Sequence, residues 1–253
     1  MYNFLKCPTC GHSFAKDNEG YECSHCKHKI PTTEEGVPIF INHFKENEVK
    51  IHNTQKSLLK SSVKKIFFAP HHSTYSDLTS SHSEPEELLA LLKQFPPESV
   101  ILNIGSLSKN LQRLHKGILN LDICYYPNID FIADACDLPF RDESIDMVIF
   151  KNVLEHVKNP MKALSEIRRV LKKGGILYTK IPFLQPFHAV PDDFQRYTKS
   201  GFRGLFKDYQ ELDFGVSVGG GLCYRGSFAN ILRSLPHSAT TNFIGLAFNF
   251  GGG

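Results

Sequence analysis

The sequence has no tryptophan, and no apolar run in its 253 residues is long enough to cross a membrane. A membrane-spanning helix needs about 18 consecutive apolar residues, so we expect no membrane span. The first six residues are not followed by the apolar run and small-residue cleavage site of a secretory signal. We therefore expect a cytoplasmic protein. Without tryptophan, the twenty phenylalanines and the leucines must fill most of the core.

Long runs of residues with the same charge are also absent from the sequence. The formal net charge is +3, and the basic residues are scattered rather than clustered. Such a balance neither requires nor excludes an acidic partner such as RNA. Nothing in the sequence indicates the oligomeric state.

Cysteine, in contrast, is concentrated near the N-terminus. Cys7 and Cys10 form one CxxC pair, and Cys23 and Cys26 form a second pair twelve residues later. Two such pairs supply four thiolates to a tetrahedral zinc ion, and a core-poor segment of this length needs such a metal to fold. Gly11 follows the first pair, where the turn favours a positive φ. We predict a structural zinc-ribbon-like module over residues 1–41.

Other interpretations of these cysteines are weaker. Four unrelated buried cysteines would rarely adopt this spacing, and a redox CxxC motif does not need a second pair. Nearby histidines could replace one sulfur ligand, although four sulfurs suffice: His12, His25 and His28.

A polar stretch over residues 42–84 indicates a linker, with one short helix around residues 55–68. The histidine-rich segment 71–75 within it is interpreted as solvated loop. From residue 85 to residue 253 the pattern changes to that of a folded domain.

Short apolar runs alternate with helical patterns in this second part. The predicted strands cover residues 99–105, 117–122, 129–134, 145–150 and 176–181. One helix begins after Pro85, and another begins at Asn159 and Pro160 and ends in a basic turn at Lys172 and Lys173. Alternating strands and helices predict an α/β fold with a doubly wound, mostly parallel, Rossmann-like sheet.

Four segments carry a family resemblance, in order and with consistent spacing: residues 134–140, 142–146, 153–157 and 169–175. In these segments the chain resembles the class I S-adenosylmethionine-dependent methyltransferases of the type 11 group. The resemblance covers residues 100–206 and implies S-adenosylmethionine as cofactor.

In a doubly wound sheet the ligand lies across the carboxyl ends of the strands. The resemblance implies that Asp122 binds the ribose hydroxyls, that Asp134 and Ala135 bind the adenine, and that Gly105 passes close to the methionine end. The predicted cofactor-binding residues are Asn103, Gly105, Ser106, Asp122, Asp134, Ala135 and Lys151. The family's glycine-rich first motif keeps only Gly105 here, so a chain that no longer binds the cofactor is an alternative.

The segment after the last predicted strand, residues 182–198, resembles one found in a bacterial subset of the group, often encoded near sugar and cell-surface biosynthesis. It gathers a base, acids, a cation and aromatic side chains where the acceptor would bind. The predicted catalytic residues are His188, His156, Asp192, Arg196 and Tyr197. The alternatives are a surface crossing in which Arg196 pairs with Asp192, and a His156 that packs against the sheet.

The leading prediction is methyl transfer to oxygen or nitrogen of a small-molecule or glycan acceptor. One alternative is a ribosomal RNA base methyltransferase whose zinc module grips RNA, although acidic residues dilute the lysines of that module. A second alternative is a methyltransferase-fold binding protein without catalysis.

Overall fold

The computed structural model describes residues 3–17, 20–41, 84–107, 111–183, 185, 187–188, 192–218 and 227–234. The predicted short helix around residues 55–68 and the histidine-rich segment 71–75 lie outside these ranges. Within them, no helix is both long enough and apolar enough to span a bilayer.

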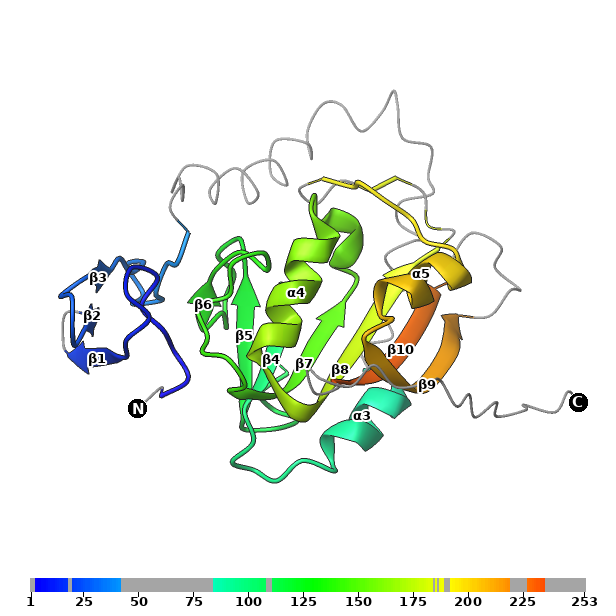
Figure 1. Ribbon diagram of the computed structural model, residues 1–253, viewed down its shortest axis with the longest axis horizontal. Coiled ribbons are helices and arrows are strands. Elements are labelled where there is room, and N and C mark those ends of the chain that lie inside the picture. The colour runs from blue at the N-terminus through cyan, green and yellow to red at the C-terminus, as the bar shows by residue number, and fades with distance from the viewer. Residues whose placement is uncertain are drawn as a thin grey trace, which may run out of the picture.

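A seven-stranded sheet forms the centre of the molecule, in the order β6-β5-β4-β7-β8-β10-β9 (Figure 1). The first five strands of this order are parallel, and β10 runs antiparallel to both of its neighbours. Each predicted strand has its counterpart, and the α/β Rossmann-like prediction is confirmed. The strands are β4 (Ile101–Ile104), β5 (Ile118–Asp122), β6 (Phe131–Ile132), β7 (Ile145–Lys151), β8 (Leu171–Pro182), β9 (Tyr209–Val218) and β10 (Ser227–Ser234).

Three α-helices among the described residues accompany this sheet: α3 (Glu86–Leu92), α4 (Pro160–Val170) and α5 (Lys199–Leu205). The Asn159 side chain caps α4 by accepting a 3.2 Å hydrogen bond from the Lys162 amide. The predicted end of this helix is wrong, because α4 ends at Val170, before the two lysines that were expected in its last turn. Leu171 is extended and pairs with Ile145, so the two following lysines lie in β8 and not in a last helical turn.

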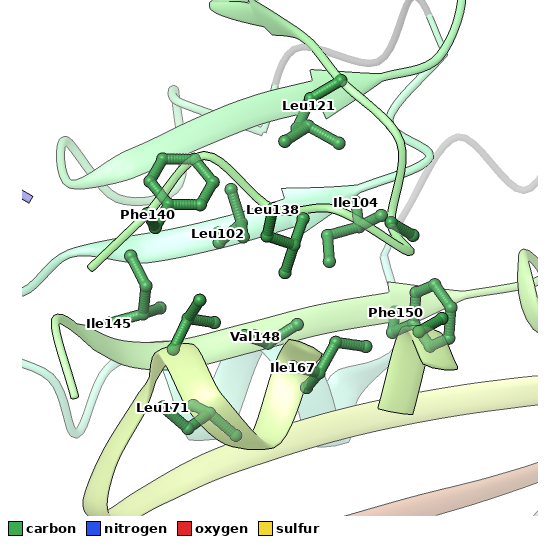
Figure 2. Packing of buried hydrophobic residues seen from close by; sticks show 14 of the residues in the cluster. Leu102, Ile104, Leu121, Leu138, Phe140, Ile145, Val148, Phe150, Ile167 and Leu171 are labelled. Carbon is green, nitrogen blue, oxygen red and sulfur yellow. The ribbon is translucent and has the colours of Figure 1, made fainter. Parts of the chain in front are cut away.

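The two faces of the sheet bury separate sets of side chains, as alternation along each strand requires. Leu102 and Val148 point to the face covered by α4 and α5, while Ile101 and Met147 point to the face covered by α3. Figure 2 shows side chains of the first set, with Ile167 of α4 among them. The strands are buried on both faces, which explains their continuous apolar runs.

A small three-stranded antiparallel sheet precedes this core: β1 (Phe14–Asp17), β2 (Gly20–Cys23) and β3 (Lys29–Ile30). It lies on the β6 side of the large sheet (Figure 1). The chain that follows it pairs with the edge strand, because the Phe40 amide donates to the Ile132 carbonyl at 2.8 Å and the Ile132 amide donates to Pro38 at 3.0 Å. The N-terminal unit thus covers an edge that would otherwise be unpaired. Its boundary at residue 41, and the linker over residues 42–84, remain predictions.

Candidate functional site

Gly105 directly follows β4 in a backbone conformation that suits glycine. Its φ is +69°, and a Cβ atom there would lie 2.2 Å from Cγ2 of Val153. The Gly105 amide donates to the Leu121 carbonyl at 2.8 Å, which ties the end of β4 to the end of β5. The positive φ and the closeness of Val153 both require glycine at this position.

Asp122 ends β5 and is buried beside the loop that leaves β4. Its Oδ2 accepts a hydrogen bond from the Leu107 amide at 3.0 Å, and its Oδ1 accepts one from Cys124 at 3.1 Å. Each carboxylate oxygen can accept more than one hydrogen bond. The carboxylate is therefore oriented by two backbone amides at the end of β5.

Ser106, Asp134 and Ala135 lie at the same end of the sheet. Ser106 is buried, and within the described part of the chain its Oγ has no hydrogen-bond partner. Asp134 is half-buried, and its Oδ1 accepts from the Cys136 amide at 2.8 Å in a tight turn that also buries Ala135. A buried hydroxyl without a partner calls for a ligand atom or water.

Two of the predicted cofactor residues have protein partners. The Asn103 side chain donates to Asn120 Oδ1 at 2.9 Å inside the sheet. Lys151 at the end of β7 forms an ion pair with Glu84 at the start of α3, with both side chains largely buried. Both side chains therefore connect β4 and β7 to neighbouring segments. Their contact with a cofactor remains a prediction.

The remaining features fit S-adenosylmethionine. Gly105 offers backbone without a side chain, Ser106 offers a buried hydroxyl with no hydrogen-bond partner among the described residues, and Asp122 offers an oriented carboxylate. All three lie at the carboxyl ends of β4 and β5, where a doubly wound sheet binds its ligands.

A second group of polar side chains lies just beyond β7. Val153, which touches the Gly105 backbone, leads into a 3₁₀ turn over Leu154–His156. Glu155 in this turn is completely buried, and within the described residues neither of its carboxylate oxygens has a hydrogen-bond partner. Burial raises the pKa of Glu155 to about 7, although the charge of Arg196 opposes the rise.

Two predicted histidines face this carboxylate. His156 Nε2 lies 3.8 Å from Glu155 Oε1, and His188 Nε2 lies 3.9 Å from the same atom. The two imidazole rings meet edge to face, with centroids 4.9 Å apart. His188 comes from the segment after β8, so the fold brings together two residues that sequence analysis took as separate candidates.

The other predicted residues of this segment have structural partners. Arg196 forms a bidentate ion pair with Asp193 and also donates to the Gln185 carbonyl at 3.1 Å. The alternative in which Arg196 pairs with Asp192 is therefore wrong, because the partner of Arg196 is Asp193. Asp192 instead accepts a hydrogen bond from His156 through its backbone carbonyl. Tyr197 packs against the main core, and burial raises its pKa.

Sequence analysis missed Glu155 and Asp193 as site residues. Glu155 stands between apolar residues in a segment quoted for the family resemblance, and its inward orientation is set by the 3₁₀ turn. Asp193 is adjacent to the predicted Asp192, and its pKa is lowered to about 2, chiefly by hydrogen bonds from Arg196. An acidic residue inside an apolar run was the one available signal for Glu155.

The four N-terminal cysteines converge, as their spacing predicts. Their sulfur atoms all lie within 4.8 Å of one another, with Cys7 and Cys26 3.6 Å apart and Cys10 and Cys23 3.4 Å apart. A disulfide would need about 2.05 Å between sulfurs. Zn–S bonds of about 2.3 Å in a tetrahedron place sulfurs about 3.8 Å apart, so the cluster suits a zinc ion.

The two cysteine turns have matching backbone geometry. The Gly11 amide donates to the Cys7 carbonyl at 2.8 Å, and the Lys27 amide donates to the Cys23 carbonyl at 3.1 Å. The positive φ predicted for Gly11 is confirmed at 75°, and Lys27 has φ 61° at the equivalent position. Burial raises the pKa of the Cys23 thiol, but backbone hydrogen bonds from Cys26 and His25 outweigh it, so the pKa falls to about 6.

Comparisons with known proteins bear on the large sheet. Residues 104–179 match the family described as "Methyltransferase domain". The chain is 33% identical over 124 residues to the ubiquinone/menaquinone biosynthesis C-methyltransferase UbiE of Campylobacter jejuni, covering 49% of this chain and 46% of that protein. It is 44% identical over 78 residues to the demethylmenaquinone methyltransferase of Renibacterium salmoninarum, covering 29% of this chain and 33% of that protein.

The matches therefore span less than half of the length of these relatives. Among solved structures, a SAM-dependent methyltransferase from Methanosarcina mazei aligns with a TM-score of 0.47 and 19% identity, covering 58% of this chain and 97% of that chain. The family match covers residues 104–179, which form the central part of the large sheet.

Proposed function

We propose that this protein transfers a methyl group from S-adenosylmethionine to a small-molecule acceptor. The observation that carries the proposal lies at the ends of β4 and β5: the buried hydroxyl of Ser106, which has no hydrogen-bond partner in the described part of the chain, and the oriented carboxylate of Asp122. Asp122 would accept both ribose hydroxyls, and Asp134 would accept the adenine amino group.

The transfer is an in-line displacement. The acceptor's electron pair forms the new bond to the methyl carbon, while the pair of the C–S bond remains on sulfur and leaves with S-adenosylhomocysteine. Alignment supplies most of the lowering of the barrier. A hydroxyl acceptor must also lose a proton. Glu155 and His156 follow Val153 by two and three residues, and His188 comes from the segment after β8 to face them.

An acceptor that carries an ionisable hydroxyl agrees best with this cluster. Its conjugate base can be methylated on oxygen, one of the two predicted acceptor atoms beside nitrogen, or on a neighbouring carbon, as the names of the C-methyltransferase relatives suggest. A glycan acceptor belongs to the same class. Zinc held by Cys7, Cys10, Cys23 and Cys26 would be structural, because four thiolates leave no position open.

Calorimetric titration of the full chain with S-adenosylmethionine tests the proposal. The wild-type protein should bind one equivalent. Asp122→Ala should weaken binding by roughly 1.5–3 kcal/mol per lost charge-assisted hydrogen bond. His188→Ala should leave cofactor affinity nearly intact, since it lies on the acceptor side. Wild-type protein that binds no cofactor would favour the non-catalytic alternative. If Asp122→Ala bound the cofactor as tightly as the wild type, Asp122 would not be the residue that binds the ribose.

A further inference from the structure

Glu155, His156 and His188, the cluster beyond β7, have the arrangement of a metal-binding site, which proton transfer alone does not require. Three potential metal ligands converge on one point: Glu155, His156 and His188 each offer one ligand atom, and these three atoms all lie within 4.8 Å of one another. Glu155 is completely buried, and among the described residues both of its oxygens lack a hydrogen-bond partner. A carboxylate in this state is costly unless a proton or a cation compensates it.

The outer nitrogen, Nδ1, of each histidine lies near an oxygen atom that can accept its proton. His156 Nδ1 faces the Asp192 backbone carbonyl, which can only accept, so the proton resides on Nδ1 and the Nε2 lone pair points toward Glu155. His188 Nδ1 lies 3.4 Å from Asp193 Oδ2, and the bidentate pair with Arg196 fixes that carboxylate.

Arg196 Nη2 also lies 3.3 Å from His188 Nδ1, but it already donates to Asp193 at 2.7 Å. A cation on Nε2 of His188 requires the proton on Nδ1, where Asp193 can accept it. Metal-binding histidines nearly always donate their second nitrogen to a carbonyl or carboxylate in this way.

We infer that Glu155, His156 and His188 bind a divalent transition-metal cation, separate from the zinc predicted at the cysteines. Two imidazoles and one carboxylate favour zinc, iron(II), cobalt(II) or manganese(II) over calcium and magnesium. Bonds of about 2.1 Å separate neighbouring ligand atoms by about 3.0–3.4 Å, so the observed 3.8 and 3.9 Å must shorten by about half an ångström.

Three protein ligands leave coordination positions open, as in catalytic metal sites. If the proposed methyl transfer holds, an acceptor hydroxyl could occupy such a position, and the cation would lower its pKa. This use of the cation rests on the proposed function, whereas binding of the cation does not.

Cobalt(II) titration of the full-length, zinc-loaded protein tests the inference. We expect one equivalent to bind with ligand-field absorption bands and without the thiolate charge-transfer band that cobalt at the cysteines would give. Glu155→Gln and His188→Gln should abolish this binding. Glu155→Gln preserves volume and removes a buried charge, so its thermal unfolding should match or exceed that of wild type. Asp193→Asn should weaken cobalt binding about 10–100-fold.

Glu211→Gln serves as a matched control, because Glu211 pairs with Arg203 on α5 and takes no part in the cluster. It should bind cobalt like the wild type. No cobalt beyond the cysteine site, or unchanged binding in Glu155→Gln, would overturn the inference and leave a shared proton as the compensation for Glu155. S-adenosylmethionine is absent from this experiment, so its result is independent of the test of methyl transfer.

Discussion

At the scale of single residues, Gly105 links the two halves of the candidate site. Its backbone has a left-handed φ of +69°, and its missing side chain lets Val153 lie against the end of β4. The same contact sets the start of the turn that carries Glu155. Conformation and space therefore both select glycine at this position.

Gly105→Ala and Gly174→Ala separate these two causes. Gly174 also has a positive φ, +75°, but a Cβ atom there would meet no atom of the described residues within 4 Å. Gly174→Ala should cost about 1–2 kcal/mol of unfolding free energy from backbone strain alone. Gly105→Ala should cost about 1–3 kcal/mol more because of the overlap with Val153. Urea denaturation measures both, and Val153→Ala added to Gly105→Ala should recover part of the excess. Equal costs for the two alanines would contradict the close contact.

At the scale of elements, α4 fastens the segment that joins β6 to β7. Glu166 accepts a hydrogen bond from the Leu138 amide at 3.0 Å, and Arg169 donates to the Leu138 and Phe140 carbonyls at 2.9 and 2.7 Å. Glu166 and Arg169 also pair with each other at 2.7 Å. This segment in turn contacts the N-terminal unit, since the Lys6 amide donates to the Pro139 carbonyl at 3.1 Å.

The ion pair between Glu166 and Arg169 predicts a loss of folding stability in acid. Burial raises the pKa of Glu166, but Arg169 outweighs it, so the folded pKa lies below the unfolded value of about 4.3. The stabilisation is present above pH 4.3 and is lost as the pH falls through the folded pKa. Glu166→Gln should lower the unfolding free energy by roughly 1.5–3 kcal/mol at pH 7, with a smaller difference from wild type below pH 4.

Glu143→Gln is the control for this measurement, because Glu143 is exposed and lies 3.8 Å from Lys173 at the surface. It should change the unfolding free energy by less than about 1 kcal/mol at either pH. A constant difference between Glu166→Gln and wild type from pH 7 to pH 3 would show that the charge of Glu166 contributes nothing.

At the scale of the whole molecule, aromatic side chains connect the cysteine module to the large sheet. Phe14 of β1 contacts Phe40 with ring centroids 6.0 Å apart, Phe40 contacts Phe131 of β6 at 6.4 Å, and Phe131 contacts Phe140 at 5.6 Å. Leu5 is completely buried in the same cluster. The module therefore contributes to the core that supports the candidate site.

Removal of the predicted zinc should consequently destabilise the whole chain. Metal analysis of protein purified without chelator should find zinc bound at the cysteines, and Cys23→Ser with Cys26→Ser should lose it. Calorimetry should then record a lower melting temperature for the main transition, because an unfolded module exposes Phe131 and Phe140. Cys124→Ser, outside the cysteine cluster, should retain both zinc and melting temperature. A folded module without metal would contradict the zinc assignment, and an unchanged main transition would contradict the coupling.

The sequence by itself determined the parallel strands β4 to β8, the α4 start and the paired cysteine turns, because apolar runs, a capping asparagine and CxxC spacing act over a few residues. It did not predict the antiparallel strands β9 and β10 or the small sheet. It also pointed to Gly105 and Asp122, since the ends of successive parallel strands share one edge of a sheet. Only the tertiary structure decided which distant side chains meet. It buried Glu155 against His156 and His188, paired Arg196 with Asp193, and joined residues 38–40 to β6. The physical reason is that such pairings depend on how loops close over the packed sheet, and local sequence patterns carry no information about that closure.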